Sequence, residues 1–283
     1  MNMSIDAGLL AQRVRELPAL PKAALDALAA LRDDVSSAQQ CGELIARDQA
    51  LVARVLRLAN SAFYGVPGRV ASVGDAVHLL GRRTLGSLLT VATVSQQFNA
   101  NACASFSFPG FWRHALATAL AARALAGARD ADAEQAFTAG LLHDIGRLVL
   151  AAHFPAQMDA AVQRAHADDV RLTQIEHEAL GTDHLAVGTL VATQWRFPQA
   201  VVLAIGSHHL PQADSDGQAS LADIVHAADA IAHALDLAGD AHDMVPALDA
   251  AAWQRMAMPA AAVLRIFADT ETQVVQLCQA MDL

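Results

Sequence analysis

Apolar residues recur at steps of three and four along most of this chain, and this spacing predicts a protein built from helices. Clear examples run over residues 24–31 and 51–59. The spacing places apolar side chains on one face of an α-helix, where they can pack against a neighbour. Strand signals are nearly absent, because no Asn-Gly or Asp-Gly pair joins two alternating runs, and the nine prolines separate the helical segments. We therefore expect an all-α fold.

Composition limits the functions open to the chain. Of its 283 residues, 54% are hydrophobic and 17% are charged, yet no apolar stretch approaches the roughly 20 residues that a membrane helix needs. Its first residues lack the pattern of an export signal, so we expect a soluble, cytoplasmic protein with no membrane partner. The net charge of −10 comes without a block of Lys and Arg, which disfavours nucleic acid as a partner. The three cysteines lie far apart, and we expect them to be core thiols.

A break in the helical periodicity divides the chain. The pattern weakens over residues 97–101 and resumes after Pro109. We expect one helical module over residues 1–104 and a second helical domain over residues 105–283. The first module lacks any set of neighbouring acids and bases, so we expect it to bind a partner and not to carry chemistry.

The adjacent residues His143 and Asp144 interrupt the apolar run over residues 140–150. Burying an unpaired imidazole and carboxylate is costly, so both groups need partners. A metal ion would be one such partner, and hydrogen bonds to the backbone and to a neighbouring helix are the alternative. Other helical segments supply further candidate ligands, namely His114, His184, His208, His209 and Asp229.

Each of these candidates also has a structural interpretation. His184 follows the N-cap candidate Asp183, and His208 and His209 precede Pro211, where protonated imidazoles would stabilise a helix end. Taken together, however, imidazoles and carboxylates from five segments predict a site for Mn, Fe, Ni or Zn. Such metals lower the pKa of bound water and orient phosphate oxygens. We assign a structural role to the other seven histidines, with His226 and His233 as the best substitutes for Asp229.

The first half of the chain resembles a known family, the HDOD domain proteins, which are bacterial signalling relatives of the HD phosphohydrolases. The matching segments are Leu17-Pro18-Ala19-Leu20-Pro21, residues 47–51, Leu58-Ala59-Asn60-Ser61-Ala62-Phe63-Tyr64-Gly65, and residues 72–81. Gln49 stands where the family usually has proline. The resemblance covers nearly the whole chain, and it implies an N-terminal helical bundle packed on an HD-like helical domain.

The second half resembles the HD core, and it matches the metal-binding pattern of the related HD-GYP phosphodiesterases position by position. The resemblance implies that the metal ligands are His114, His143, Asp144, His184, His208, His209 and Asp229. It also implies a divalent cofactor, one of Fe, Mn, Ni, Zn or Mg. Two departures count against turnover: no Gly-Tyr-Pro element follows His209, and Arg147 replaces the usual lysine. Arginine keeps the charge for phosphate contact but does not deliver a proton.

The resemblance implies a bacterial regulator that works by protein–protein contact with a signalling partner, in a circuit that involves a cyclic dinucleotide or another nucleotide. We expect the contact surface in the first half, around Arg54, Arg57 and Arg82, and we expect hydrolysis to be absent or very slow. The competing hypothesis is a metal-dependent phosphohydrolase or cyclic-dinucleotide phosphodiesterase in which Arg147 holds the phosphate. Sensing of a metal or nucleotide without turnover lies between these two hypotheses.

Overall fold

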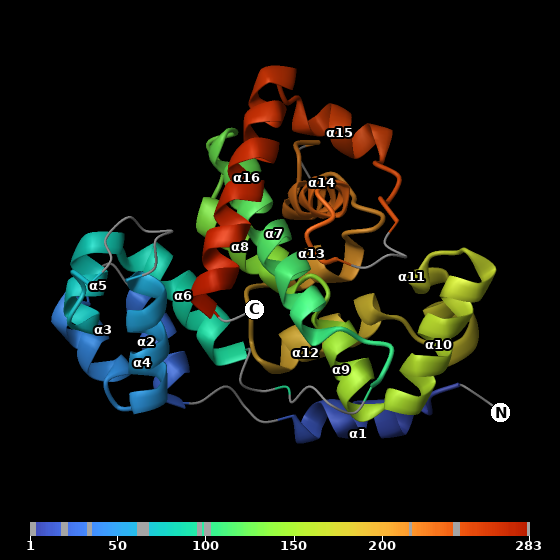
Figure 1. Ribbon diagram of the computed structural model, residues 1–283, viewed down its shortest axis with the longest axis horizontal. Coiled ribbons are helices and arrows are strands. Elements are labelled where there is room, and N and C mark those ends of the chain that lie inside the picture. Colours follow the sequence, from blue (N-terminus) through green and yellow to red (C-terminus); the bar gives the residue numbers. More distant parts are fainter. Residues whose placement is uncertain are drawn as a thin grey trace. The chain divides into compact units, whose positions relative to one another are not determined.

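The protein is described from a computed structural model that covers residues 4–17, 22–32, 36–60, 68–94, 98, 103–214, 217–239 and 244–281. Within these ranges every regular element is a helix, so the predicted all-α fold is confirmed (Figure 1). The helices are α1 Ala7–Glu16, α2 Lys22–Arg32, α3 Ala38–Ile45, α4 Gln49–Ala59, α5 Val73–Leu80, α6 Arg82–Val94, α7 Phe108–Gly127, α8 Ala133–Leu142, α9 Ile145–His153, α10 Pro155–Asp168, α11 Leu172–Ile175, the π-helix η2 Glu176–Leu180, α12 His184–Gln194, α13 Gln199–Ser207, α14 Leu221–Ala234, α15 Ala250–Met256 and α16 Ala260–Met281. No described helix is both long enough and apolar enough to cross a lipid bilayer.

The chain forms two compact units. Unit 1 comprises Met1–Leu17 and Phe98–Glu271, and unit 2 comprises Pro18–Gln97 and Thr272–Leu283. Helix α16 therefore begins in unit 1 and ends in unit 2. The functional division, with an HDOD-type module over residues 1–104 and an HD-like domain over residues 105–283, stays a prediction.

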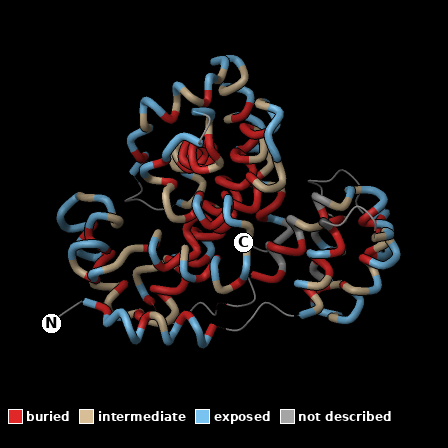
Figure 2. The backbone as a smooth tube through the Cα atoms, turned by 180° about the vertical axis from the view of Figure 1, so that it is seen from behind, coloured by how far each residue is buried: buried red, intermediate tan, exposed pale blue. Residues whose placement is uncertain are grey.

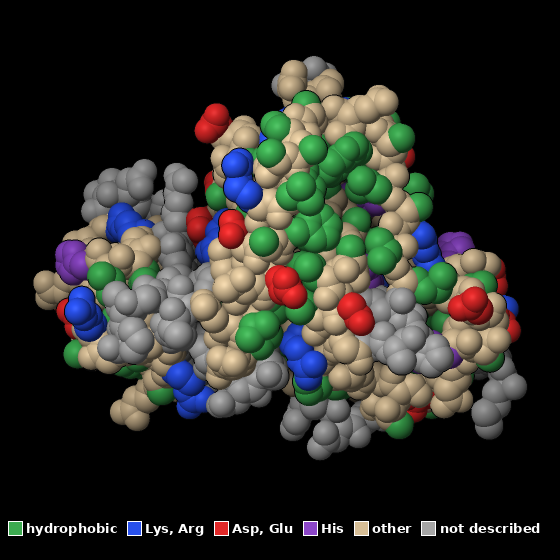
Figure 3. All heavy atoms as spheres, turned by 45° about the horizontal axis from the view of Figure 1, so that its top comes forward, with side chains coloured by type: hydrophobic (Ala, Val, Ile, Leu, Met, Phe, Trp, Pro, Cys, Tyr) green, Lys and Arg blue, Asp and Glu red, His purple; other side chains and the backbone are tan. Residues whose placement is uncertain are grey.

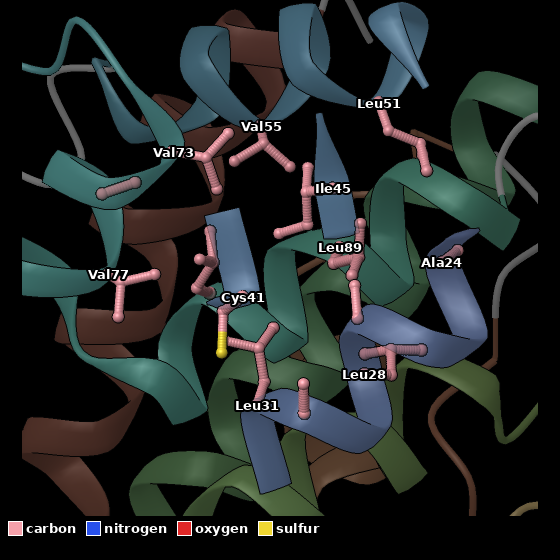
Figure 4. Packing of buried hydrophobic residues seen from close by; sticks show 14 of the residues in the cluster. Ala24, Leu28, Leu31, Cys41, Ile45, Leu51, Val55, Val73, Val77 and Leu89 are labelled. Carbon is pink, nitrogen blue, oxygen red and sulfur yellow. The ribbon is translucent and has the colours of Figure 1, made fainter. Parts of the chain in front are cut away.

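Unit 2 has a hydrophobic core of its own. The apolar faces predicted from the periodicity, including Leu28 and Leu31 of α2 and Val55 of α4, point into this core together with Ile45 of α3 and Leu89 of α6 (Figure 4). Cys41 lies in the same core, and Cys103 and Cys278 are likewise buried free thiols, as expected from their spacing.

Unit 1 is organised around the long helix α7. Helices α8 and α14 pack along α7, while α12 packs against α9 and α13. Figure 2 shows that buried residues, in red, follow these central helices. The first turn of α7 is fixed by Ser107, whose side chain accepts a hydrogen bond from the backbone of Gly110, and by Pro109, which needs no donor there.

Glycines allow two pairs of helices in unit 1 to approach closely. A Cβ on Gly140 of α8 would lie 2.9 Å from Cα of Ala119 on α7. A Cβ on Gly146 of α9 would collide with the carbonyl oxygen of His184 on α12. These two crossings bring the segment between α8 and α9, which carries His143 and Asp144, against both α7 and α12.

Basic and acidic side chains are mixed on one face of the molecule (Figure 3). On the face drawn in Figure 3, the Lys and Arg side chains in blue are scattered among acidic side chains in red. This distribution agrees with the net charge of −10.

Candidate metal centre

All seven predicted ligands lie in unit 1 and come together in its interior. His114 projects from α7, His143 and Asp144 lie between α8 and α9, and His184 begins α12. His208 and His209 follow α13, and Asp229 lies in α14. Six of these residues are buried and His209 is mostly buried.

Two of the predicted ligands, His114 and His143, lie against the Asp229 carboxylate. Its Oδ1 lies 3.0 Å from Nε2 of His114 and 3.4 Å from Nε2 of His143. The two imidazole nitrogens are 3.2 Å apart. His114, His143 and Asp229 each present a ligand atom within 4.8 Å of the other two, which is close enough for one metal ion to bind all three.

A second set of three imidazoles, from His184, His208 and His209, also has its ligand atoms within 4.8 Å of one another. Asp144 lies between the two sets. Its Oδ1 is 3.2 Å from Nε2 of His184, and its Oδ2 is 3.5 Å from Nε2 of His143. A carboxylate with one oxygen toward each set can bridge two metal ions, as in binuclear hydrolytic centres.

Hydrogen bonds at Nδ1 orient three of the imidazoles with Nε2 inward. Nδ1 of His143 lies 2.7 Å from the carbonyl oxygen of Gly140, and Nδ1 of His208 lies 3.0 Å from that of Ile205. Nδ1 of His184 lies 2.5 Å from a carboxylate oxygen of Glu176. Donation from Nδ1 leaves the Nε2 lone pair of a neutral imidazole free for a metal.

Several buried polar atoms at the centre have no hydrogen-bond partner among the described residues, for example Nε2 of His208 and Oδ2 of Asp229. Buried polar atoms are rarely left without a partner, because the loss of water is then uncompensated. Nitrogen and carboxylate oxygen atoms are the ligands that Mn, Fe, Ni and Zn accept. The residues present therefore fit a divalent metal.

At His208, His209 and Asp144 the electrostatics of the site favour the protonation states that bind metal. Burial lowers the pKa of His208 well below its usual range, and burial beside His184 lowers the pKa of His209 to about 3. Burial opposes ionisation of Asp144, but the charge of Arg147 and the neighbouring imidazoles hold the pKa of this carboxyl well below its usual range. The pKa of His143 is raised, because Asp144 and Asp229 outweigh the effect of burial. A metal bound there would take the place of that proton.

Glu176 belongs to the site although the sequence analysis did not identify it. It lies in the π-helix η2, its side chain is fully buried, and one carboxylate oxygen accepts hydrogen bonds from both the backbone N–H and the ring Nδ1 of His184. One feature of the sequence could have indicated that Glu176 is buried: it lies between the apolar residues Ile175 and Leu180, and both of these are buried in the structure. Glu176 holds His184 in the orientation that a metal requires.

His226 and His233 also support the centre. Nε2 of His233 lies 3.4 Å from Oδ1 of Asp229, one helical turn away on α14. His226 places its Nδ1 2.7 Å from the carbonyl oxygen of His208, while its Nε2 accepts a hydrogen bond from the backbone of Asp249. The structural role expected for His226 agrees with these contacts. The spacing of four residues between Asp229 and His233 could have predicted from the sequence that their side chains are in contact on one face of a helix.

Arg147 projects from the first turn of α9 onto the centre. Its Nη1 lies 2.8 Å from Oδ2 of Asp144, and its Nε lies 3.9 Å from Oε1 of Glu176. The guanidinium thus offsets part of the negative charge that three buried carboxylates bring to the site.

A pocket of about 630 Å³ opens onto the centre. His114, Asp144, Arg147, His209 and His233 line its inner end. The volume lies within the range of small-molecule binding sites in proteins. A ligand in this pocket would contact the metal ligands directly.

Comparisons with known proteins give the family and the fold of the chain. The family model of the HDOD domain matches residues 17–211. An uncharacterized protein of Treponema pallidum (strain Nichols) is 27% identical over 224 residues, which cover 74% of this chain but only 41% of that relative. The chain therefore spans less than half the length of this curated relative.

Solved structures show the same fold. A protein from Shewanella amazonensis SB2B, provisionally named a phosphohydrolase, is 29% identical with a TM-score of 0.73, and the match covers 96% of this chain and 97% of that one. An HDOD domain protein of unknown function from Geobacter sulfurreducens has a TM-score of 0.78 at 22% identity, with 97% and 99% covered. A protein from Marinobacter aquaeolei VT8, provisionally named a signal transduction protein, has a TM-score of 0.77 at 23% identity, with 95% and 60% covered. With the family model matching well over half of its length, the chain belongs to the HDOD domain family.

Proposed function

We propose that this chain is a signalling protein that binds one or two divalent metal ions at the His/Asp centre and acts on a protein partner. The observation that carries the metal proposal is the position of Asp144, with one oxygen toward each of two sets of three ligands. His114, His143 and Asp229 would hold one ion, and His184, His208 and His209 the other. A bound metal would lower the pKa of a water ligand and polarise a phosphate group.

The metal proposal is tested on full-length protein purified without chelators or a histidine tag. Elemental analysis should find at least one equivalent of a first-row divalent metal in the wild type and much less in Asp144→Ala. Wild-type protein that stays free of metal after incubation with Mn²⁺, Fe²⁺ and Zn²⁺ in turn would overturn the proposal.

The signalling role is supported by the family and by the name of the Marinobacter relative. We place the partner contact on unit 2, where Arg57 and Arg69 are exposed. Arg82 has a different role from the expected one, because its guanidinium donates to the carbonyl oxygen of Ser36 and lies 3.7 Å from Sγ of Cys41. The side chains of Arg54 and Arg83 lie outside the described residues. A cyclic dinucleotide or another nucleotide stays our candidate for the upstream signal.

The second candidate function is metal-dependent phosphoester hydrolysis. It is favoured by the pocket that opens onto the centre and by the name of the Shewanella relative. The ion pair of Arg147 with Asp144 counts against it, since an arginine stays protonated and supplies no proton to a leaving group.

Turnover separates the two candidates. We expect metal-loaded protein to hydrolyse simple phosphoesters, nucleotides and cyclic dinucleotides very slowly or not at all. Efficient hydrolysis that Asp144→Ala abolishes, with the helical circular-dichroism spectrum retained, would establish the phosphohydrolase instead.

A further inference from the structure

The pocket in unit 1 has two chemically different parts. Its inner end is the metal centre, with Arg147 beside Asp144. The walls that lead away from the centre are more apolar than polar. Their apolar side chains include Phe106, Phe111, Val162, Ala165, Val170 and Leu172, and their polar side chains include Ser105, Ser107, His166, Arg171, Thr173 and Gln174. An anionic group and an apolar group would therefore find suitable surroundings at opposite ends of the same pocket.

The apolar wall is held together by aromatic packing. The rings of Phe106 and Phe111 have centroids 5.7 Å apart, and Phe106 also packs edge-on against Phe108 at 5.0 Å. Phe111 is buried on α7, whereas Phe106 is half-buried, so Phe106 presents part of its ring to the pocket. Hydrophobic side chains from α10 and α11 complete this wall.

Part of the rim of the pocket is apolar. Leu210 and Met244 line the pocket and are 76% and 40% exposed, and the adjacent Val245 is 55% exposed. Large exposed apolar side chains that line a pocket favour a binding role, since isolated ones elsewhere are ordinary. On the face drawn in Figure 3, histidine atoms in purple are visible between hydrophobic side chains in green.

Among the described residues, two arginines and one carboxylate, that of Asp144, are the Arg and Asp side chains that line the pocket. Arg171 lines it, is exposed, and makes no ion pair within the described part of the chain. Arg147 lines the inner end, where divalent metal ions would add further positive charge. A phosphate dianion complements this end of the pocket better than a neutral or cationic group does.

We propose that the pocket binds a phosphomonoester with an apolar body. The phosphate lies against the metal centre and Arg147, and the body lies along Phe106 and Leu172 toward Leu210. This inference rests on the proposed metal site and names the class of ligand that the site takes. Inorganic phosphate would leave most of the 630 Å³ unfilled. Apolar side chains outnumber polar ones along the walls, so an apolar body would bury more apolar surface there than a sugar does.

Calorimetric titration of the full-length, Mn²⁺-loaded protein tests the ligand class. The probes are inorganic phosphate, glucose 6-phosphate, AMP, butyl phosphate and octyl phosphate. Each buried methylene group contributes roughly a fourfold gain in affinity, so octyl phosphate should bind at least tenfold more tightly than inorganic phosphate, with butyl phosphate between them. Equal affinities across the alkyl series, or tighter binding of AMP or glucose 6-phosphate than of octyl phosphate, would overturn the proposal.

Matched leucine variants locate the apolar body. Leu210→Asn changes an exposed side chain that lines the pocket, and Leu203→Asn changes a 59% exposed side chain on α13 that does not line it. We expect Leu210→Asn to weaken octyl phosphate binding about threefold or more and to leave inorganic phosphate binding unchanged. The control Leu203→Asn should change neither affinity, and an equal loss in both variants would contradict the assigned position.

The same titrations distinguish this inference from the proposed function. If the protein takes up no metal, the proposed function fails and the inference falls with it. If the protein takes up metal and binds inorganic phosphate, but gains nothing from an alkyl chain, the metal centre stands and the apolar-bodied ligand is wrong.

Discussion

Three imidazoles direct Nε2 toward the centre because Nδ1 of each ring is hydrogen-bonded to an oxygen on the other side. For His143 and His208 the group that accepts from Nδ1 is a carbonyl oxygen three residues earlier in the chain, at Gly140 and Ile205. For His184 it is the carboxylate of Glu176, which comes from a different helical element. A carboxylate that accepts from Nδ1 also makes Nε2 a stronger donor to a metal, so Glu176 influences both the position and the basicity of His184.

Removal of this carboxylate should weaken metal binding. We expect Glu176→Ala to lower Mn²⁺ affinity about 10- to 100-fold, and Glu176→Gln to lower it less, because the amide oxygen still accepts a hydrogen bond. Competition with a fluorescent chelator measures the affinity. The matched control is Glu178→Ala in the same π-helix, where the carboxylate is exposed and pairs with Arg164. An equal loss of affinity in the control would show that the effect comes from damage to η2.

His209 should make the metal-free protein less stable in acid. Its pKa is about 3 in the folded protein and about 6.5 when unfolded, so between these values the unfolded chain binds a proton that the folded chain does not. The free energy of unfolding therefore rises with pH and gains its full value above about pH 6.5. The loss from this residue at pH 5 should be about 2 kcal/mol.

The contribution of His209 is isolated by urea denaturation of wild type and His209→Gln at pH 7.5 and pH 5, both with chelator. The variant should lose less stability on acidification than the wild type. The raised pKa of His143 makes the free energy of unfolding fall as pH rises, which is opposite to the effect of His209. His143 is present in both proteins, so its contribution cancels in the comparison. An identical pH dependence in the two proteins would contradict the assignment.

These residues also show which part of the centre a sequence can reveal. His143 and Asp144 interrupt an apolar run, so the sequence predicts that both are buried and need polar partners or a metal. Glu176 lies among the polar residues His177 and Glu178, which are exposed. Its burial depends on the wider turn of a π-helix, which a 3.6-residue period does not describe. The sequence pattern therefore identified candidate ligands but missed the carboxylate that orients one of them.

At the scale of helices, the centre depends on how closely α9 approaches α12. Gly146 follows Asp144 by two residues and faces His184, so the absence of a Cβ lets the carboxylate and the imidazole come within 3.2 Å. Gly188 on α12 faces Gly146 across the same crossing, and an added Cβ there would also lie 2.8 Å from Cγ2 of Ile205 on α13. The sequence predicted helices in this region but not the distance between them. A glycine in a helix indicates a close contact between two helices only when the packing partner of that helix is known.

Adding a methyl group at this crossing should affect both stability and metal binding. We expect Gly146→Ala to destabilise the metal-free protein by about 1–3 kcal/mol, because backbone atoms must shift to make room, and to weaken Mn²⁺ binding. Gly127→Ala is the control, since a Cβ at the end of α7 meets no atom within 4 Å. Chemical denaturation and metal titration should show the control unchanged or slightly more stable. Full metal affinity in Gly146→Ala would show that the crossing does not hold the ligands.

At the scale of the whole molecule, the chain forms two compact units, and the candidate metal centre lies in unit 1. The core of unit 2 comes from α2 to α6, whereas all the candidate ligands lie in unit 1. The all-α class followed from the sequence alone, because a 3.6-residue period is a local property. The assignment of residues 1–17 to unit 1 and of residues 272–283 to unit 2 depends on long-range contacts, which local periodicity does not encode.

Metal removal should therefore act on one unit of the protein. A ligand that binds only the folded state stabilises it by about 2.7 kcal/mol at 100 times its Kd, which for a unit of this size corresponds to a shift of about 5–10 °C. We expect scanning calorimetry to resolve two transitions, with chelator lowering only the one that belongs to unit 1. Asp144→Ala should abolish the response to Mn²⁺ and leave the unit 2 transition in place. A single transition that moves as a whole, or two transitions that respond equally to chelator, would show that the two cores unfold together and that the metal stabilises the whole chain.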